Sequence, residues 1–282
     1  MDTLVIDHDN VLSMLPDRDV NAHKGCFGKI LLLCGSEGYT GAAALSAMGA
    51  LRCGAGLVYL GVPRCIYSIM AVKLNEPVVF PLPDSDGMLS AAAIQQIGMR
   101  LNMMDAVLIG PGLGQSEGTL DILRYVLECY TGPIVLDADG INLLAEHKDL
   151  LRGRTGVTIL TPHEGEFRRL GYARTDNKAL DAATAAVDLG VIMVLKGHNT
   201  VITDGHRCYI NPTGNPGMAV GGSGDVLAGM ITAFLGMNIP PLQAAACGAW
   251  LHGAAGDRCA QSMGQYGMLP SDMLDVLPQL MK

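Results

Sequence analysis

The chain has 282 residues, of which 49% are hydrophobic and 16% charged, and its formal net charge is -8. This composition predicts a globular protein with a large buried core and argues against disorder. The acidic balance, with no run rich in lysine and arginine, gives no electrostatic basis for binding DNA, RNA or an anionic membrane.

No apolar stretch reaches the roughly 20 residues of a membrane span, and the N-terminus lacks a basic region followed by an apolar core. We therefore expect a cytoplasmic protein. The eight cysteines never fall in a C-x-x-C spacing, and buried thiols are the favoured interpretation. The seven histidines form no zinc-binding pattern, so the expected metal chemistry is Mg²⁺ held by carboxylates and phosphate.

Short apolar runs alternate with segments of helical period along the first two thirds of the chain. Continuous apolar runs are typical of strands that are buried on both faces of a parallel sheet. The predicted strands are 29–34, 57–62, 106–110, 133–139, 157–162 and 191–197. The predicted helices between them are 41–53, 116–130, 139–147, 163–171 and 177–189. This order predicts an α/β fold, a three-layer α/β/α sandwich around a mostly parallel central sheet.

The period changes after Lys196. Two short strand-like pieces in 200–212 flank an Asp-Gly turn signal, which predicts a hairpin at an edge of the sheet. Three helices are predicted to follow, at 225–236, 241–261 and 271–281. Because no linker, repeat or low-complexity tract interrupts the chain, we expect residues 1–282 to form a single domain.

The segments that follow the predicted strands combine glycine, proline and single polar residues. Ligands of open parallel sheets bind beyond the carboxyl ends of the strands, where such segments can line a pocket for an anion with backbone N–H groups. These segments are CGSEGYTGAA (34–43), IGPGLGQS (109–116), LDADGINLL (136–144), LTPHEGEF (160–167) and LKGHNT (195–200), together with the glycine-rich stretch 211–230.

The glycine-rich stretch contains GGSGD, in which Asp225 directly precedes an apolar helix. It matches neither the P-loop pattern nor the dinucleotide-binding pattern, so an ordinary P-loop NTPase or Rossmann dehydrogenase is excluded. Glycines before a helix can hold a phosphoryl group with their N–H groups and the helix dipole, and Asp225 would then face an acceptor hydroxyl. Alternatively, Asp225 only satisfies amides of the first turn, and the motif alone supports both interpretations equally.

LTPHEGEF places His163 and Glu166 three residues apart, so that on a first helical turn both can point into the crevice. For Glu166 we favour a role in organising Mg²⁺ and water around phosphates, and for Glu164 a surface carboxylate that matches the helix dipole. Lys196 ends a buried strand, from which it can either extend to solvent or neutralise a phosphate.

His198, His206 and His252 have no partner visible in the sequence, and taken alone they are interpreted as structural or surface residues.

Taken in order, HKGCFGKILLLCGS, YTGAAALSAMGALRCGAGLV, IGPGLG, VLDADGINLL, TPHEGEFRRL, VLKGHNT and NPTGNPGMAVGGSGDVLAGMI resemble the ADP/ATP-dependent (S)-NAD(P)H-hydrate dehydratases. The resemblance runs from about Leu15 to the C-terminus. It implies a ribokinase-like fold and the stand-alone form, because the chain leaves no room for the N-terminal epimerase domain that some members carry. The implied reaction restores NADH or NADPH from its hydrate while ADP or ATP is hydrolysed.

The resemblance also implies roles for individual residues. Asp225 would take the proton of the ring hydroxyl, with the amides of Gly222, Ser223 and Gly224 stabilising the transferred phosphoryl group. The positions that match the binding site for the hydrated cofactor are Ala42, Gly112, Gly114, His163 and Asp225. Those that match the adenine nucleotide site are Lys196, Gly197, His198, Asn199, Thr200, Asn215, Gly217, Met218, Gly221, Gly222 and Gly224.

Glu166 matches the acidic residue that ribokinase-like enzymes use near Mg²⁺, and we expect it to act through water. His163 stands where the sugar kinases of the superfamily usually have asparagine, which favours the dehydratases over them. The family commonly has a small residue or proline in place of Glu164. Stand-alone members suggest ADP as the donor, and the resemblance to the family implies a homo-oligomer, a tetramer, as the assembly.

Two alternatives belong to other classes. A ribokinase-like kinase acting on a vitamin-precursor alcohol would share the glycine-rich motif, but HKGCFG and TPHEGE argue against it. A non-catalytic nucleotide-binding module would keep the glycines without needing Asp225. The sequence does not distinguish NADH hydrate from NADPH hydrate, nor does it identify the group that removes the last ring proton.

Overall fold

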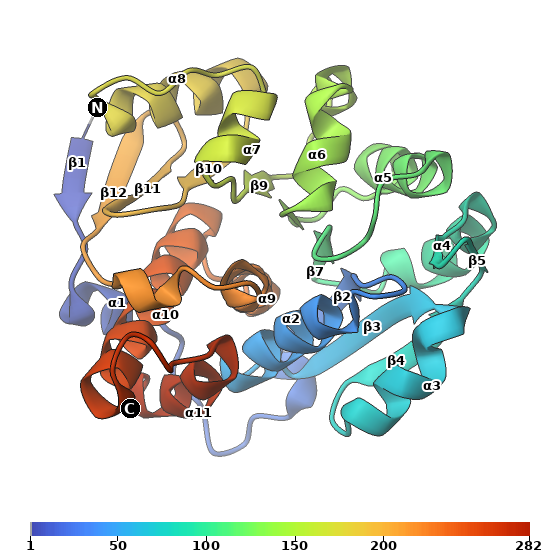
Figure 1. Ribbon diagram of the computed structural model, residues 1–282, viewed down its shortest axis with the longest axis horizontal. Coiled ribbons are helices and arrows are strands. Elements are labelled where there is room, and N and C mark those ends of the chain that lie inside the picture. The colour runs from blue at the N-terminus through green and yellow to red at the C-terminus, as the bar shows by residue number, and fades with distance from the viewer. Residues whose placement is uncertain (1) are drawn as a thin grey trace.

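A computed structural model describes residues 2–282 (Figure 1). Ten strands form one sheet in the order β1-β12-β11-β10-β9-β8-β7-β2-β3-β4, and β5 and β6 form a separate hairpin. The strands are β1 Asp2–Val5, β2 Lys29–Leu33, β3 Leu57–Pro63, β4 Val78–Leu82, β5 Asp84–Ser85, β6 Met88–Leu89, β7 Ala106–Ile109, β8 Ile134–Leu136, β9 Thr158–Leu160, β10 Ile192–Leu195, β11 Thr200–Thr203 and β12 Arg207–Asn211. Only β11 runs against its neighbours, which confirms the mostly parallel sheet and the predicted hairpin.

Helices cover both faces of this sheet. The α-helices are α1 His8–Met14, α2 Thr40–Arg52, α3 Arg64–Lys73, α4 Ile94–Leu101, α5 Glu117–Cys129, α6 Asp139–Ala145, α7 Glu164–Arg169, α8 Lys178–Leu189, α9 Ser223–Gly236, α10 Pro241–Met263 and α11 Pro270–Leu280. Short 3-10 helices are η1 Lys24–Phe27, η2 Ala91–Ala93, η3 Lys148–Leu151 and η4 Pro216–Met218. In Figure 1, α6, α7 and α8 lie on one side of the strands and α2, α9 and α10 on the other.

Alternation along the strands creates the two cores. Ile30 and Leu32 of β2 join the core that contains α2, α9 and α10, whereas Leu31 and Leu33 join the core that contains α4, α5 and α8. Because successive side chains of a strand point to opposite faces, a continuous apolar run fills both cores at once. The structure therefore confirms the predicted α/β/α sandwich.

Elements at the two edges of the sheet lie outside the prediction. The edge strand β4 contains Pro81, which has no N–H for a ladder, and β1 at the opposite edge has all four residues exposed. Helices α1, α3 and α4 were also not predicted.

Five cysteines are buried as expected, but Cys26, Cys65 and Cys129 are exposed.

Helix α2 packs closely on α9. The apolar face of residues 44–56 therefore packs within the subunit. A Cβ atom on Gly229 would come within 2.0 Å of the Ser46 carbonyl oxygen, and one on Gly49 within 2.6 Å of the Val226 carbonyl oxygen. This close approach fixes the beginning of α9 beside α2.

The strand order reverses between β2 and β7. From β2 the chain builds outward through β3 to β4, then returns to the other side of β2 and continues from β7 to β10. Such a reversal leaves a crevice beyond the carboxyl ends of the two central strands. The segments after β2 and β7 therefore border the expected ligand site.

Within residues 2–282, no helix is both long enough and apolar enough to cross a bilayer.

We expect Gly229→Ala to destabilise the protein, because the new methyl group would clash with the backbone of α2. Overpacking of this kind costs about 1–3 kcal/mol, which corresponds to a melting temperature lower by about 3 °C or more. The control is Gly41→Ala, where a Cβ atom has nothing within 4 Å. Thermal unfolding of both variants tests the packing, and equal melting temperatures would contradict it.

Candidate functional site

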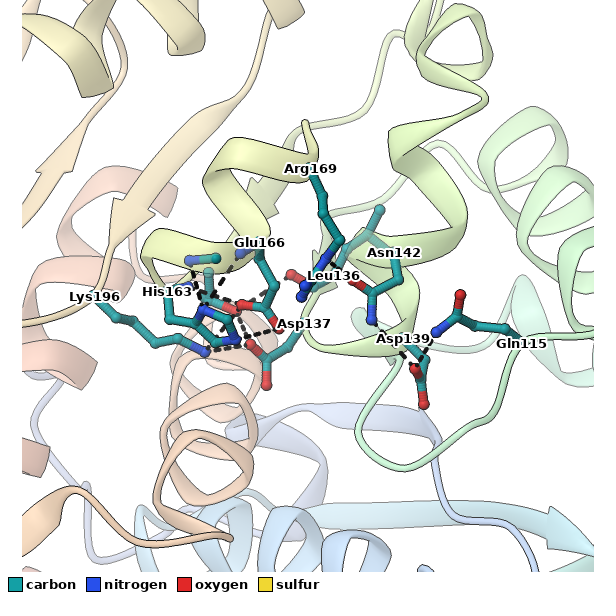
Figure 2. A network of polar contacts seen from close by, with 11 residues as sticks. Gln115, Leu136, Asp137, Asp139, Asn142, His163, Glu166, Arg169 and Lys196 are labelled. Carbon is teal, nitrogen blue, oxygen red and sulfur yellow. Dashed lines mark hydrogen bonds and ion pairs between the residues drawn. The ribbon is translucent and has the colours of Figure 1, made fainter. Parts of the chain in front are cut away.

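The ammonium group of Lys196 is surrounded by carboxylates at the carboxyl ends of β8, β9 and β10 (Figure 2). Lys196 Nζ donates a hydrogen bond to Asp137 Oδ1 at 2.8 Å and lies 3.9 Å from Glu166 Oε2. Both carboxylate side chains are almost fully buried, and that of Lys196 is 19% exposed. Although burial lowers the pKa of Lys196, the charges of Asp137, Glu166 and Asp225 raise it overall, so the ammonium stays protonated.

Asp225 lies in the first turn of α9, beside this group. Burial, and next the negative charge of Asp137, raise the pKa of Asp225 to about 6, while Lys196 opposes them. Its carboxylate accepts no hydrogen bond from any residue between 2 and 282, including the first-turn amides of α9. Capping therefore does not explain Asp225, which is a partly buried carboxylate with a pKa suited to a general base.

The glycines before Asp225 bring the backbone close to the carboxylates. Gly222, with a φ of 101°, is the N-cap of α9. A Cβ atom on Gly224 would lie 3.2 Å from Lys196 Nζ and 3.7 Å from Asp137 Oδ2, so a larger residue here would require the ammonium group to shift by a few tenths of an ångström. The N-terminus of α9 therefore lies beside Lys196 and Asp137, and the N–H group of Ser223 donates to the carbonyl oxygen of Val220 at 3.3 Å. A helix N-terminus in this position is suited to a phosphoryl group.

Ser223 differs from its neighbours because its side chain is buried and directed away from the glycine-rich loop. Ser223 Oγ lies 3.3 Å from His252 Nε2, which belongs to α10. Burial lowers the pKa of His252 to about 4, so the ring is neutral at pH 7. His252, interpreted from sequence only as a structural or surface residue without a partner, is therefore a buried support for the loop.

His163 and Glu166 form a capping box at the start of α7. His163 Nδ1 accepts hydrogen bonds from the N–H groups of Gly165 and Glu166, and Glu166 Oε2 accepts one at 2.8 Å from the N–H group of His163. Since Nδ1 is an acceptor, the neutral ring carries its proton on Nε2, which lies 3.5 Å from Glu166 Oε1. The two side chains share one face as predicted, with His163 exposed and Glu166 buried.

Glu164 points elsewhere. It forms an ion pair with Arg168 at 2.7 Å on the surface of the same helix, as expected for a surface carboxylate.

Two aspartates that were not predicted as site residues flank a strained turn after β8. Ala138 has φ 49° and ψ -116°, a conformation that an L-residue adopts only at a cost. The turn sends Asp137 towards Lys196, and sends Asp139 to accept hydrogen bonds from Gly114 N at 2.9 Å and from Gln115 Nε2 at 3.0 Å. The sequence feature that could have identified them is the segment LDADGINLL, which places both carboxylates at the end of a predicted strand.

Ala42 of α2 and Gly112 and Gly114 of the segment after β7 form a second group. A Cβ atom on Gly112 would come within 2.9 Å of Ala42 Cβ, so α2 and the segment after β7 touch here. Asp139 connects the two groups, because it bonds Gly114 N and its charge also raises the pKa of Asp225.

The segment from Lys196 to Thr200 is held by a second lysine. Lys178 Nζ donates hydrogen bonds to the carbonyl oxygens of His198 at 3.0 Å and Asn199 at 3.1 Å. Thr200 Oγ1 donates to the carbonyl oxygen of Gly197. Burial lowers the pKa of Lys178 to about 8, and Lys178 was not singled out from sequence.

The second predicted nucleotide segment begins at Asn215, shortly after β12, whose Asn211 pairs with Thr200 of β11. Its side chains, however, have structural partners. Asn215 Nδ2 donates to Asp257 Oδ1 at 2.9 Å, and Gly217 N donates to Asn215 Oδ1. Met218 packs against α10, and Gly221 is exposed. Within residues 2–282, no hydrogen bond or ion pair joins these four residues to Lys196.

The carboxylates suit Mg²⁺ only in combination with other ligands. No group of three or more His, Cys, Asp or Glu residues within 2–282 is arranged to hold a metal ion. Both oxygens of Glu166 already face His163, and one faces Lys196. Mg²⁺ commonly keeps several waters and takes phosphate oxygens as ligands. The donors therefore fit an ion that Glu166 reaches through water.

The chain is similar in sequence and in overall structure to known proteins. The sequence profile of the family described as NAD(P)H-hydrate dehydratase matches residues 30–279. The ADP-dependent (S)-NAD(P)H-hydrate dehydratase of Bacillus subtilis is 35% identical over an alignment that covers 97% of this chain and 96% of the relative. A crystal structure of the ADP/ATP-dependent enzyme from B. subtilis, co-crystallised with ATP and Mg²⁺, superposes with a TM-score of 0.85 at 32% identity, covering 97% of this chain and 96% of the other.

Other relatives are longer or less similar in sequence. The bifunctional NAD(P)H-hydrate repair enzyme of Moorella thermoacetica is 44% identical over 96% of this chain, which spans 52% of that relative. The chain thus spans about half the length of several curated relatives that it matches. A ribokinase-like superfamily protein from Enterococcus faecalis has a TM-score of 0.87 at 27% identity, covering 99% of this chain and 95% of that one. The ribokinase-like fold is thereby confirmed.

We expect Asp225→Asn to stabilise the folded protein above neutral pH. The folded state binds the Asp225 proton more tightly than the unfolded state, with a pKa of about 6 against 3.8, so stability is lost as pH rises through this interval. At pH ~7.5, replacing the ionised group should raise the melting temperature by at least about 2 °C, whereas near pH ~4 the difference should shrink. A variant that is less stable at the higher pH would contradict the assigned electrostatics.

Proposed function

The chain belongs to the NAD(P)H-hydrate dehydratase family, and from this premise we propose that it dehydrates the S epimer of NADH hydrate or NADPH hydrate at the expense of ADP. The products are NADH or NADPH, AMP and phosphate. One observation carries the proposal: Asp225, a partly buried carboxylate without a hydrogen-bond partner among the described residues, stands at a glycine-lined helix N-terminus beside Lys196.

In the first step, the ring hydroxyl of the hydrate is phosphorylated. Asp225 takes the hydroxyl proton, the oxygen attacks the terminal phosphorus of ADP, and the bond from phosphorus to the bridging oxygen breaks to release AMP. The amides of Gly222, Ser223 and Gly224 and the ammonium of Lys196 stabilise the charge on the transferred group. The protein contributes positioning and electrostatics rather than a covalent intermediate.

In the second step, the phosphorylated hydrate collapses. Hydroxide is a poor leaving group, but phosphate is a good one, and the ring nitrogen lone pair expels it with cleavage of the carbon–oxygen bond. Loss of a proton from the adjacent ring carbon then restores the reduced nicotinamide. His163, whose side chain is 54% exposed, and the pair of Gly112 and Gly114 would orient the ring.

The nucleotide and the metal ion follow from the same arrangement. We propose that Lys196 to Thr200 and the backbone from Asn215 to Gly224 bind ADP, with ATP as an alternative donor. Lys178 would support the first of these segments through the carbonyl oxygens of His198 and Asn199. Glu166 would hold Mg²⁺ through water, and a bound Mg²⁺ would neutralise phosphate charge.

The sheet, its edge and the cysteines bear on domain organisation, assembly and location. We propose a single domain, supported by the one ten-stranded sheet that both halves of the chain share. A homo-oligomer, a tetramer, is supported by the exposed edge strand β1, where Leu4 and Val5 are 46% and 58% exposed. A cytoplasmic location is supported by eight free cysteines, since disulfides are rare in that compartment.

The direct test is an assay with purified NADH hydrate, ADP and Mg²⁺, monitoring recovery of reduced-nicotinamide absorbance together with release of phosphate. We expect Asp225→Asn to lower turnover by at least about a hundredfold while nucleotide binding persists. The matched control is Asp9→Asn, which removes a first-turn carboxylate from α1. A stable phosphorylated product would instead indicate a kinase, and nucleotide binding without turnover in the wild type would indicate a binding module.

The pKa of Asp225 predicts the pH profile. A general base must be ionised, so kcat/KM for the hydrate should rise with pH and level off above about 6. Initial rates at subsaturating hydrate between about pH 5 and about pH 8 would measure this acid limb. A profile that is flat through this range would reject Asp225 as the titrating base.

A further inference from the structure

A polar cavity lies beside the proposed reaction centre and has no part in the chemistry described above. Its volume is about 320 Å³, and it is lined by Gln115, Asn142, Ala145, Glu146 and Arg169. These residues come from the segment after β7, from α6 with its C-cap, and from the last turn of α7. The volume is within the lower range of small-molecule sites, enough for part of a dinucleotide.

Gln115 and Asn142, which line the cavity, are both held by the carboxylate of Asp139 (Figure 2). Asp139, whose other oxygen bonds Gly114 N, accepts hydrogen bonds from Gln115 Nε2 at 3.0 Å and Asn142 Nδ2 at 3.3 Å. The cavity therefore begins one residue beyond Gly114. A ligand whose ring contacts Gly112 and Gly114 would have its remaining part directed into this space.

Arg169 forms the other wall. Its Nη1 lies 3.9 Å from the position that a Cβ atom on Gly165 would take, and Gly165 N donates to His163 Nδ1. In Figure 2, Arg169 stands between the Lys196 group and the Asp139 group. The cavity is thus bordered on both sides by residues next to the proposed substrate positions.

The charge of Arg169 is available to a ligand. Arg169 Nε donates to Asn142 Oδ1 at 2.8 Å, which holds the guanidinium at the cavity, and Arg169 forms no ion pair with any residue in 2–282. Its neighbour Arg168 is instead paired with Glu164 at 2.7 Å. A planar guanidinium with unpaired N–H groups is suited to phosphate oxygens.

Glu146 also lines the cavity and would repel a phosphoryl group placed next to its own carboxylate. A carboxylate readily accepts hydrogen bonds from ribose hydroxyls, as acidic residues do in dinucleotide sites. A ligand with an anionic group beside Arg169 and a sugar beside Glu146 would match a diphosphate joined to a ribose.

On the basis of the proposed function, we infer that this cavity is the subsite for the diphosphate and adjoining ribose of the hydrated dinucleotide, with Arg169 as the residue that binds the diphosphate. The reacting ring is separated from the diphosphate by one ribose. Arg169 thus anchors the substrate at a distance from the reacting bond, so it should affect KM far more than kcat.

The test compares two substrates in three proteins. The substrates are NADH hydrate and the hydrate of reduced nicotinamide riboside, which has the same ring and ribose but no phosphate. The proteins are the wild type, Arg169→Gln and the control Arg168→Gln, which removes the same charge from the adjacent, paired position. An Arg169→Lys variant keeps the charge but loses the Nε bond to Asn142.

Arg169→Gln should raise KM for NADH hydrate about tenfold or more, the scale for losing a hydrogen bond to a charged group, with kcat changed by less than about twofold. The riboside hydrate and ADP should be used equally well by Arg169→Gln and the wild type. Arg168→Gln should match the wild type throughout, and Arg169→Lys should recover part of the loss.

An unchanged KM for NADH hydrate in Arg169→Gln, or an equal loss with the riboside hydrate, would overturn the inference while leaving the proposed function intact. A wild type that is inactive on both hydrates would overturn the proposed function, and the inference with it.

Discussion

The site depends on one ammonium group that balances several carboxylates. Lys196 bonds Asp137 at 2.8 Å, lies 3.9 Å from Glu166 and attracts Asp225. Asp137 also accepts a hydrogen bond from Thr161 at 2.7 Å, so its charge is well satisfied. Asp225 has no such partner among the described residues, and burial together with its acidic neighbours raises its pKa to about 6. The arrangement pairs Asp137 and Glu166 with Lys196 and leaves Asp225 ready to exchange a proton.

Backbone packing gives this charge balance its geometry. The glycine contacts between α2 and α9 bring the N-terminus of α9 over the sheet, where Gly224 leaves room for Lys196 and Asp137. The strained turn at Ala138 separates Asp137 from Asp139, so that one serves the charged centre and the other fixes Gly114. Strain at such a turn is tolerated because the surrounding structure determines it, and it commonly occurs at functional sites.

Much of the fold is predictable because buried parallel strands are continuous apolar runs. The edge strands could not be predicted from such runs, since β4 contains Pro81 and β1 is exposed along its length. Within the site, the spacing of His163 and Glu166 sufficed to place them on one face. The partner of Lys196 did not follow from spacing. Asp137 is 59 residues away, and the pair forms only because β8 and β10 both flank β9, a lateral order that local sequence does not determine. The link between Ser223 and His252 similarly needs the packing of α9 on α10.

The central claim is that Asp225 makes the ring hydroxyl attack phosphorus, so that the hydroxyl oxygen leaves as part of phosphate. The most direct measurement uses hydrate prepared in oxygen-18 water and follows the label by mass spectrometry of the released phosphate. The account predicts one labelled oxygen in every phosphate formed from labelled hydrate in ordinary water. Unlabelled phosphate, with the label in water, would show that the nucleotide is hydrolysed without phosphorylation of the substrate and would contradict the account.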